Sequence, residues 1–150
     1  DMSVETMARL SRLDKIIGVK DATADISRTS LQRYVIGENF IQLSGEDMTA
    51  LALMAHGGRG CISVTSNVAP RLCADLQDAC LSFDFKKALA IQDKLIPLHK
   101  ALFLETSPAP VKYALSLLDY CEDVVRLPLV SVTSETQVAV RDAMIYAGIL

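Results

Sequence analysis

The sequence has no long apolar run and no clustered charge of one sign. Its uninterrupted apolar stretches fall far short of the roughly 18 residues that a helix needs to cross a bilayer. The 15 Lys and Arg residues are scattered along the chain and nearly balance the 18 Asp and Glu residues, for a net charge of -3. We therefore predict neither a nucleic-acid-binding nor a membrane protein, because both kinds of partner select clustered basic or apolar residues.

The chain also lacks paired cysteines and an initiator methionine. Its four cysteines form no CxxC and have no His at metal-ligand spacing, which argues against a metal site and favours packed, reduced thiols. The opening segment DMSVETMARL fits a capped helix and not a signal peptide, so we expect a cytoplasmic protein. A chain that starts at Asp1, with a helix first, is expected to be a fragment. The cysteines predicted to pack are Cys61, Cys73, Cys80 and Cys121.

What the chain does have is apolar material for a core, with 51% hydrophobic and 22% charged residues. Short β-branched runs alternate with helical patterns, as in parallel α/β proteins. Leu31, Tyr34 and Val35 are the apolar positions of the second helix, which Gly37 should end. The predicted elements are a helix over 3–14 capped by Ser3, a strand over 16–19, a helix over 27–36, a strand over 40–43, a helix from its cap Asp47 to 56, and a strand over 61–64.

Everything after the third strand is predicted to be helical. The spacing predicts helices that begin at Pro70, at Asp84 with a kink at Pro97, and after Pro108. A capping box at Ser134 should start the last helix, which Gly148 ends. Three parallel strands cannot close a barrel and would leave an unpaired sheet edge, so the fold is expected to need further strands from a partner segment or to be an unusually small open sheet.

The predicted chemistry centres on Lys20, which follows the first strand. Ligands gather at the carboxyl ends of parallel strands, and Lys20 is the only strong nucleophile there. Burial beside Ile17, Val19 and Ile62 is expected to favour the neutral amine, which can form an imine with a keto acid. Position alone is more typical of an ordinary solvated lysine at a strand end than of a catalytic one.

Other polar or small residues carry weaker signals. Gly45 follows the second strand, where a missing side chain lets a ligand approach the backbone or simply forms a loop. His56 and His99 fit helix capping or packing, and we assign neither a catalytic role. No acid or His stands near the strand-end hydroxyls to make a serine nucleophile. The hydroxyls that could bind an anion, or only satisfy nearby backbone groups, belong to Ser63, Thr65 and Ser66.

Five segments stand out as motifs: IIGVKDAT at 16–23, LSGED at 43–47, GCISVTSNVAP at 60–70, and the later LIPLHKALF and SPAPVKYAL stretches. Together they resemble the dihydrodipicolinate synthase family of pyruvate-dependent Schiff-base aldolases. The similarity covers essentially the whole chain. It implies the C-terminal part of a (β/α)8 TIM barrel over residues 1–82, followed by a C-terminal helical subdomain over residues 83–150.

The resemblance also implies a site. The lysine of GVKDAT, here Lys20, would form the imine with pyruvate, and the backbone at Gly45 and Ile62 would line the pyruvate pocket. The enamine would then add to aspartate semialdehyde to give 4-hydroxy-tetrahydrodipicolinate, with no metal or organic cofactor. Members are commonly homotetramers, and an apolar helix over 47–56 is compatible with that assembly.

The family's paired threonines, proton-relay tyrosine and substrate-carboxylate arginine would all precede residue 1. Without this missing N-terminal half, the 150 residues alone are expected to be inactive. Two alternatives stay open. A sister aldolase that cleaves N-acetylneuraminate or 2-keto-3-deoxy sugar acids would use the same lysine, whereas a non-catalytic α/β binding module would keep the fold without the chemistry.

Overall fold

The computed structural model describes all residues from 1 to 150. The chain forms two compact units, one made of residues 1–63 and 77–85 and the other of residues 64–76 and 86–150. None of the helices combines the length and the apolar character that crossing a membrane demands. The predicted boundary after residue 82 between barrel and helical subdomain stays a prediction.

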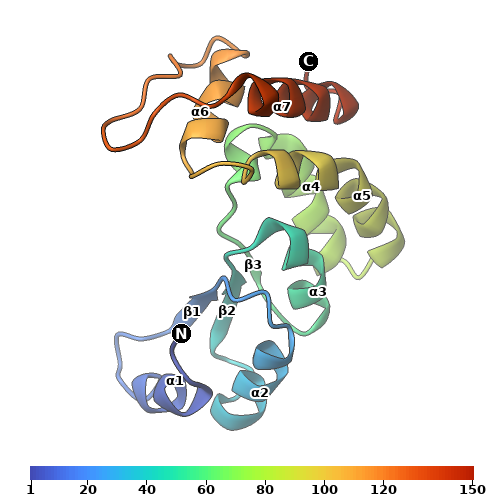
Figure 1. The fold of residues 1–150 in the computed structure, drawn as a ribbon. Helices are drawn as coiled ribbons and strands as arrows, with labels where there is room; N and C mark the ends of the chain where they lie inside the picture. The colour runs from blue at the N-terminus through green and yellow to red at the C-terminus, as the bar shows by residue number, and fades with distance from the viewer. The chain divides into compact units, whose positions relative to one another are not determined.

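The first unit is built on a three-stranded parallel sheet in the order β1-β2-β3 (Figure 1). The strands are β1 (Gly18–Asp21), β2 (Ile41–Ser44) and β3 (Gly60–Cys61). Helix α2 (Ser27–Ile36) connects β1 to β2, and α3 (Ala50–Ala55) connects β2 to β3. This β-α-β-α-β order confirms the predicted parallel α/β arrangement and is consistent with part of a barrel.

Each strand was predicted in the right place but with the wrong ends. The β-branched run Ile16–Val19 marks the apolar part of the segment, whereas the ladder of β1 extends two residues further, to Asp21. Lys20 pairs with Leu43 of β2, and therefore lies within the strand. The third strand is shorter than predicted and starts at Gly60, although Ile62 still donates a backbone hydrogen bond to Ser44 O at 2.7 Å.

Helices α1 and α2 both begin where the sequence predicts, but only α1 has a side-chain N-cap. Helix α1 (Val4–Leu10) begins after Ser3, whose Oγ accepts the Thr6 N–H at 3.2 Å as predicted, but it ends four residues before Asp14. Helix α2 starts at Ser27 and ends at Gly37, whose φ of 112° suits glycine. Helix α1 packs against α2.

Helix α2 buries polar residues and exposes its apolar positions. Its buried residues are Thr29 and Gln32. The apolar positions Leu31, Tyr34 and Val35 are 50%, 89% and 53% exposed. The helix contacts the sheet through hydrogen bonds, among them Gln42 Nε2 to Thr29 O at 3.0 Å, so polar side chains occupy the interior side.

The segment after β2 starts with a 3-10 turn, η1 (Asp47–Thr49), which leads into α3. Its cap is Glu46, whose carboxylate accepts the Met48 N–H at 3.1 Å, so the prediction that Asp47 caps this segment was wrong by one residue. Leu53 and Met54 are buried on α3, and the chain leaves the helix through Gly57 and Gly58 as predicted.

The second unit is helical, as predicted. Its elements are η2 (Thr65–Asn67), the first part of α4 (Pro70–Leu81), α5 (Phe85–Ala101), which contains Pro97, α6 (Ala109–Ser116) and α7 (Ser134–Tyr146). Thr133, and not Ser134, caps α7 through its hydroxyl. The core of this unit contains Leu76, Leu95, Leu98, Leu102, Val140 and Met144, each at most 2% exposed.

The cysteine prediction is confirmed in part. Cys73 and Cys80 are buried, Cys61 is half-buried and Cys121 is exposed. All four are free thiols, and burial raises the pKa of Cys80. Cys121 lies in the irregular segment between α6 and α7, outside the elements whose apolar periodicity marks the core.

Candidate functional site

The sheet register places the predicted site residues on one face. Lys20 pairs with Leu43, and Leu43 pairs with Gly60. Paired residues of a parallel sheet point to the same side, and the side alternates with each residue. Lys20, Gly45 and Ile62 therefore share one face at the carboxyl edge of the sheet. Asp21 and Ser44 point to the opposite, helix-covered face.

Lys20 and Gly45 lie in direct contact. A Cβ added at Gly45 would lie 2.6 Å from Cε and 3.1 Å from Cγ of Lys20, and 2.8 Å from Cβ of Ala22. The lysine side chain thus runs across the space that a side chain at Gly45 would fill. Glycine at position 45 therefore has a steric reason, namely room for the Lys20 side chain, which the sequence position alone did not indicate.

Ile62 completes the same edge through its main chain. Its N–H donates to Ser44 O at 2.7 Å, which extends the β2-β3 ladder one residue past β3. In parallel, the Gly45 N–H donates to Asp21 O at 2.8 Å and extends the β1-β2 ladder. The three strand ends are therefore tied to one another by backbone hydrogen bonds directly beside Lys20.

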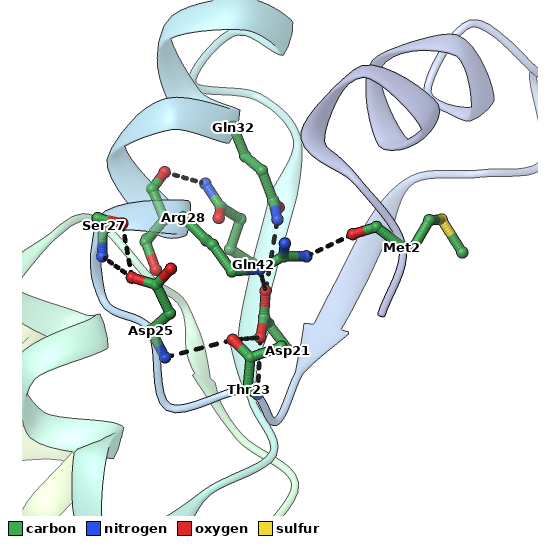
Figure 2. Close-up of polar contacts among 9 residues, drawn as sticks. Met2, Asp21, Thr23, Asp25, Ser27, Arg28, Gln32 and Gln42 are labelled. Carbon is green, nitrogen blue, oxygen red and sulfur yellow. Dashed lines mark hydrogen bonds and ion pairs between the residues drawn. The ribbon is translucent and has the colours of Figure 1, made fainter.

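On the helix-covered face, Asp21 is the centre of a polar cluster (Figure 2). Its carboxylate accepts hydrogen bonds from Thr23 N at 2.9 Å and Thr23 Oγ1 at 2.6 Å, and pairs with Arg28 Nε at 2.8 Å. Gln32 Nε2 is 3.4 Å away. Burial by itself would raise the pKa of Asp21, but the hydrogen bonds from Thr23 and Arg28 and the charge of Arg28 outweigh it and hold that pKa below its ordinary value of 3.8.

The burial expected around Lys20 is not provided by these 150 residues. Lys20 is exposed, and Ile62 is 51% exposed. Ile17 and Val19 alternate to the other side of β1, so the prediction that they flank the amine was wrong. Ile17 is itself 69% exposed, although its carbonyl oxygen accepts the Ile41 N–H at 3.0 Å just before β1 begins. The face that carries Lys20 is uncovered in this chain.

The other polar candidates His56, Thr65 and His99 form hydrogen bonds with other side chains. His56 is the C-cap residue of α3, and its Nδ1 shares a 2.9 Å hydrogen bond with Ser30 Oγ. Thr65 and His99 belong to the second unit, where both are buried and Thr65 Oγ1 lies 2.7 Å from His99 Nδ1. The expectation that no His stands near these hydroxyls was therefore wrong for Thr65, because α5 brings a residue 34 positions away to its side chain. No group of three or more His, Cys, Asp or Glu side chains is arranged to hold a metal ion.

The cluster around Asp21 was missed at the level of sequence. Thr23, Arg28 and Gln32 follow Asp21 by two, seven and eleven residues, and polar residues such as Arg28 and Gln32 in a helical pattern are typical of a solvent-exposed face. The available signal was their spacing: Arg28 and Gln32 stand four residues apart and so share one face of α2, which follows directly after the strand that carries Asp21.

The fold defines a parallel α/β protein, and Lys20 lies over Gly45 at the carboxyl edge of the sheet, the edge where proteins of this class bind their ligands. A model of the dihydrodipicolinate synthetase family matches residues 1–146. The chain therefore belongs to the dihydrodipicolinate synthetase family.

Individual relatives agree with this assignment. The chain is 63% identical to the 4-hydroxy-tetrahydrodipicolinate synthase of Methylobacterium radiotolerans and 61% identical to that of Afipia carboxidovorans, over all 150 residues in both cases. These matches cover 50% and 51% of the two relatives, so the chain spans about half their length. The crystal structure of dihydrodipicolinate synthase from Aquifex aeolicus superposes with a TM-score of 0.95 at 39% identity, covering 99% of this chain and 51% of that one.

Proposed function

We propose that the complete protein is a class I aldolase that condenses pyruvate with aspartate semialdehyde to 4-hydroxy-tetrahydrodipicolinate, in lysine and diaminopimelate biosynthesis. The observation that carries this proposal is the Lys20 side chain lying across Gly45 at the carboxyl edge of the sheet, in a chain of this family. Residues 1–82 would form the last strands and helices of a (β/α)8 barrel, and residues 83–150 its C-terminal helical subdomain.

The proposed reaction begins at Lys20 Nζ. The neutral amine attacks the keto carbon of pyruvate, and loss of water from the resulting carbinolamine forms an imine. The protonated imine withdraws electrons, so the pyruvate methyl group loses a proton and becomes an enamine. The enamine carbon attacks the aldehyde of aspartate semialdehyde. The amino group of that substrate then displaces Lys20 from the imine carbon, which closes the ring and frees the lysine.

The contribution of these 150 residues would be the nucleophile and the surface against which pyruvate rests. Gly45 and Ile62 would present main-chain groups to the substrate, as their positions at the strand ends beside Lys20 support. Holding the amine and the keto carbon at reacting distance replaces a bimolecular encounter and is worth a large share of the rate enhancement. Neither a metal nor an organic cofactor enters these steps.

The remaining part of the site would come from the missing N-terminal half of the barrel. Two observations support this partner: the face of the sheet that carries Lys20 is uncovered, and β1 is an edge strand. Covering this face would remove water from around the amine and favour its neutral form. We further infer a cytoplasmic homotetramer for the complete enzyme, to be checked by light scattering after gel filtration.

The experiment uses a full-length chimaera, in which the N-terminal half of the Afipia carboxidovorans synthase is joined ahead of residue 1. We expect this chimaera to condense pyruvate with aspartate semialdehyde and not to cleave N-acetylneuraminate or 2-keto-3-deoxy sugar acids. Lys20→Ala should abolish the condensation. Cleavage of a sugar acid without condensation would favour the sister aldolases. A chimaera with neither activity would favour the non-catalytic binding module.

A further inference from the structure

Asp21 follows the proposed imine lysine along β1 but points to the opposite face of the sheet. There its side chain is 9% exposed, and Arg28, its ion-pair partner, is 16% exposed. By contrast, the other ion pair of the chain, Arg33–Glu38, is 45% and 71% exposed. A largely buried carboxylate with a guanidinium and two Thr23 donors around it is held in one orientation, whereas an exposed pair is free to separate.

The main chain of Asp21 is joined to the other side of the site. Its carbonyl oxygen accepts the Gly45 N–H at 2.8 Å, so Asp21 takes part in both the polar cluster and the link between β1 and Gly45. Arg28 extends the cluster to the chain start, because its Nη2 donates to Met2 O at 2.9 Å (Figure 2). The carboxylate therefore ties the end of β1 to α2 and to the segment before α1.

From this arrangement we propose that Asp21 is a positioning residue for imine formation, holding the end of β1 so that Lys20 Nζ meets its substrate over Gly45. The inference rests on the proposed function. Lys20 and Asp21 are adjacent, so a rotation or shift of the strand end that accompanies loss of the carboxylate moves both Lys20 and the backbone partner of Gly45. Asp21 contacts neither pyruvate nor the reacting atoms, and acts only through the position of Lys20.

Asp21→Asn is the direct perturbation. The amide still accepts from Thr23, but it loses the charge that pairs with Arg28 and leaves a largely buried guanidinium without its anion. A displacement of reacting groups by about 1 Å costs about 100-fold in rate. We therefore expect the rate of imine formation with pyruvate, measured in single turnover by borohydride quench and mass spectrometry on the full-length chimaera, to fall by about 10- to 100-fold.

The effect should separate the two substrates. The variant's kcat/KM for pyruvate should fall by about 10- to 100-fold, whereas its kcat/KM for aspartate semialdehyde should change by less than about threefold, because the covalent bond itself fixes the amine once the imine exists. Asp21→Glu keeps the charge and should restore imine formation to within about threefold of the parent. Equal losses for both substrates, or no rescue by Glu, would overturn the positioning role.

Gln42→Ala is the matched structural control. Gln42 is 5% exposed and joins β2 to α2 through Thr29 O, without a hydrogen bond to Asp21. The Gln42→Ala variant should have a lower melting temperature than the parent, yet its kcat/KM for pyruvate should stay within about twofold of the parent value. A loss as large as that of Asp21→Asn would show that any loosening of α2 has the same effect, and the assignment to Asp21 would fail.

Thr23→Val provides a second, milder test if Asp21→Asn does not fold. It removes the 2.6 Å hydroxyl hydrogen bond to Asp21 while keeping the ion pair with Arg28, and should slow imine formation by about three- to tenfold. An unchanged rate would contradict the proposal. The parent chimaera distinguishes a failure of the proposed function from a failure of the positioning role. No trapped pyruvate in the parent refutes the proposed function, whereas normal trapping in both Thr23→Val and Asp21→Asn refutes the positioning role alone.

Discussion

Substituting Gly45 by alanine tests the contact on which the site depends. The new Cβ would lie 2.6 Å from Lys20 Cε and 2.8 Å from Ala22 Cβ. Unbonded carbon atoms settle at about 3.5 to 4.0 Å, so the lysine chain has to move by about 1 Å. Ala22 has no side-chain freedom, so the strand ends must also separate, at a cost of about 1–3 kcal/mol in the free energy of unfolding.

A displacement of about 1 Å at a reacting group corresponds to a loss of about 100-fold in rate. We expect Gly45→Ala to lower kcat/KM for pyruvate by about that factor in the full-length chimaera, with a matching loss of pyruvate trapped by borohydride. The double variant Gly45→Ala with Ala22→Gly removes the clash between the strand ends but not the clash with Lys20. It should therefore regain stability while the trapping stays impaired.

Gly148→Ala is the control for a destabilised glycine elsewhere. Gly148 follows α7 with a φ of 69°, a conformation that costs an alanine about 1–2 kcal/mol. The variant should melt earlier and still trap pyruvate normally. Normal trapping by Gly45→Ala would refute the reasoning, because it would mean that Lys20 does not need the space over residue 45.

Four further results are expected. The 150 residues alone should show no steady-state turnover, and adding the N-terminal half of the relative in trans should restore it. The folded pKa of Asp21 is depressed, so its stabilisation is complete above its ordinary value of 3.8 and is lost as the pH falls through the folded pKa. In urea titrations the parent should therefore lose more stability than Asp21→Asn as the pH falls below about 4. Hydrogen bonds from Thr136 and Thr133 lower the pKa of Glu105 in the same way, and Glu105→Gln should likewise weaken the acid dependence of stability. Leu98→Ala, at a position 0% exposed, should cost about 2–5 kcal/mol in the free energy of unfolding.

The order of elements could be predicted from local patterns, but their ends could not. β-branched runs mark the apolar part of a strand, whereas pairing continues for as long as the neighbouring backbone is in register. Lys20 and Asp21 thus joined β1 because Leu43 and Ser44 lie opposite them. Caps were displaced by one residue at Glu46 and Thr133 for a similar reason, since adjacent polar residues compete for the same N–H groups.

The site could be predicted only in part. Lys20, Gly45 and Ile62 were identified from motifs, and the register explains why they share an edge. Contact between the Lys20 side chain and Gly45 depends on two segments more than twenty residues apart, which no local pattern encodes. The apolar spacing of Leu31 and Tyr34 could not indicate which face of α2 is buried. The buried face carries the polar Gln32, whose amide donates a hydrogen bond to the Asp21 carboxylate.

The most direct test is to trap the covalent intermediate. The full-length chimaera is incubated with pyruvate, reduced with borohydride, digested, and its peptides are sequenced by mass spectrometry, with Lys20→Arg as the parallel sample. We predict one reduced pyruvate adduct, on Lys20, and none in the variant. An adduct on another lysine, or an active chimaera with no adduct at all, would contradict the assignment of Lys20 as the nucleophile.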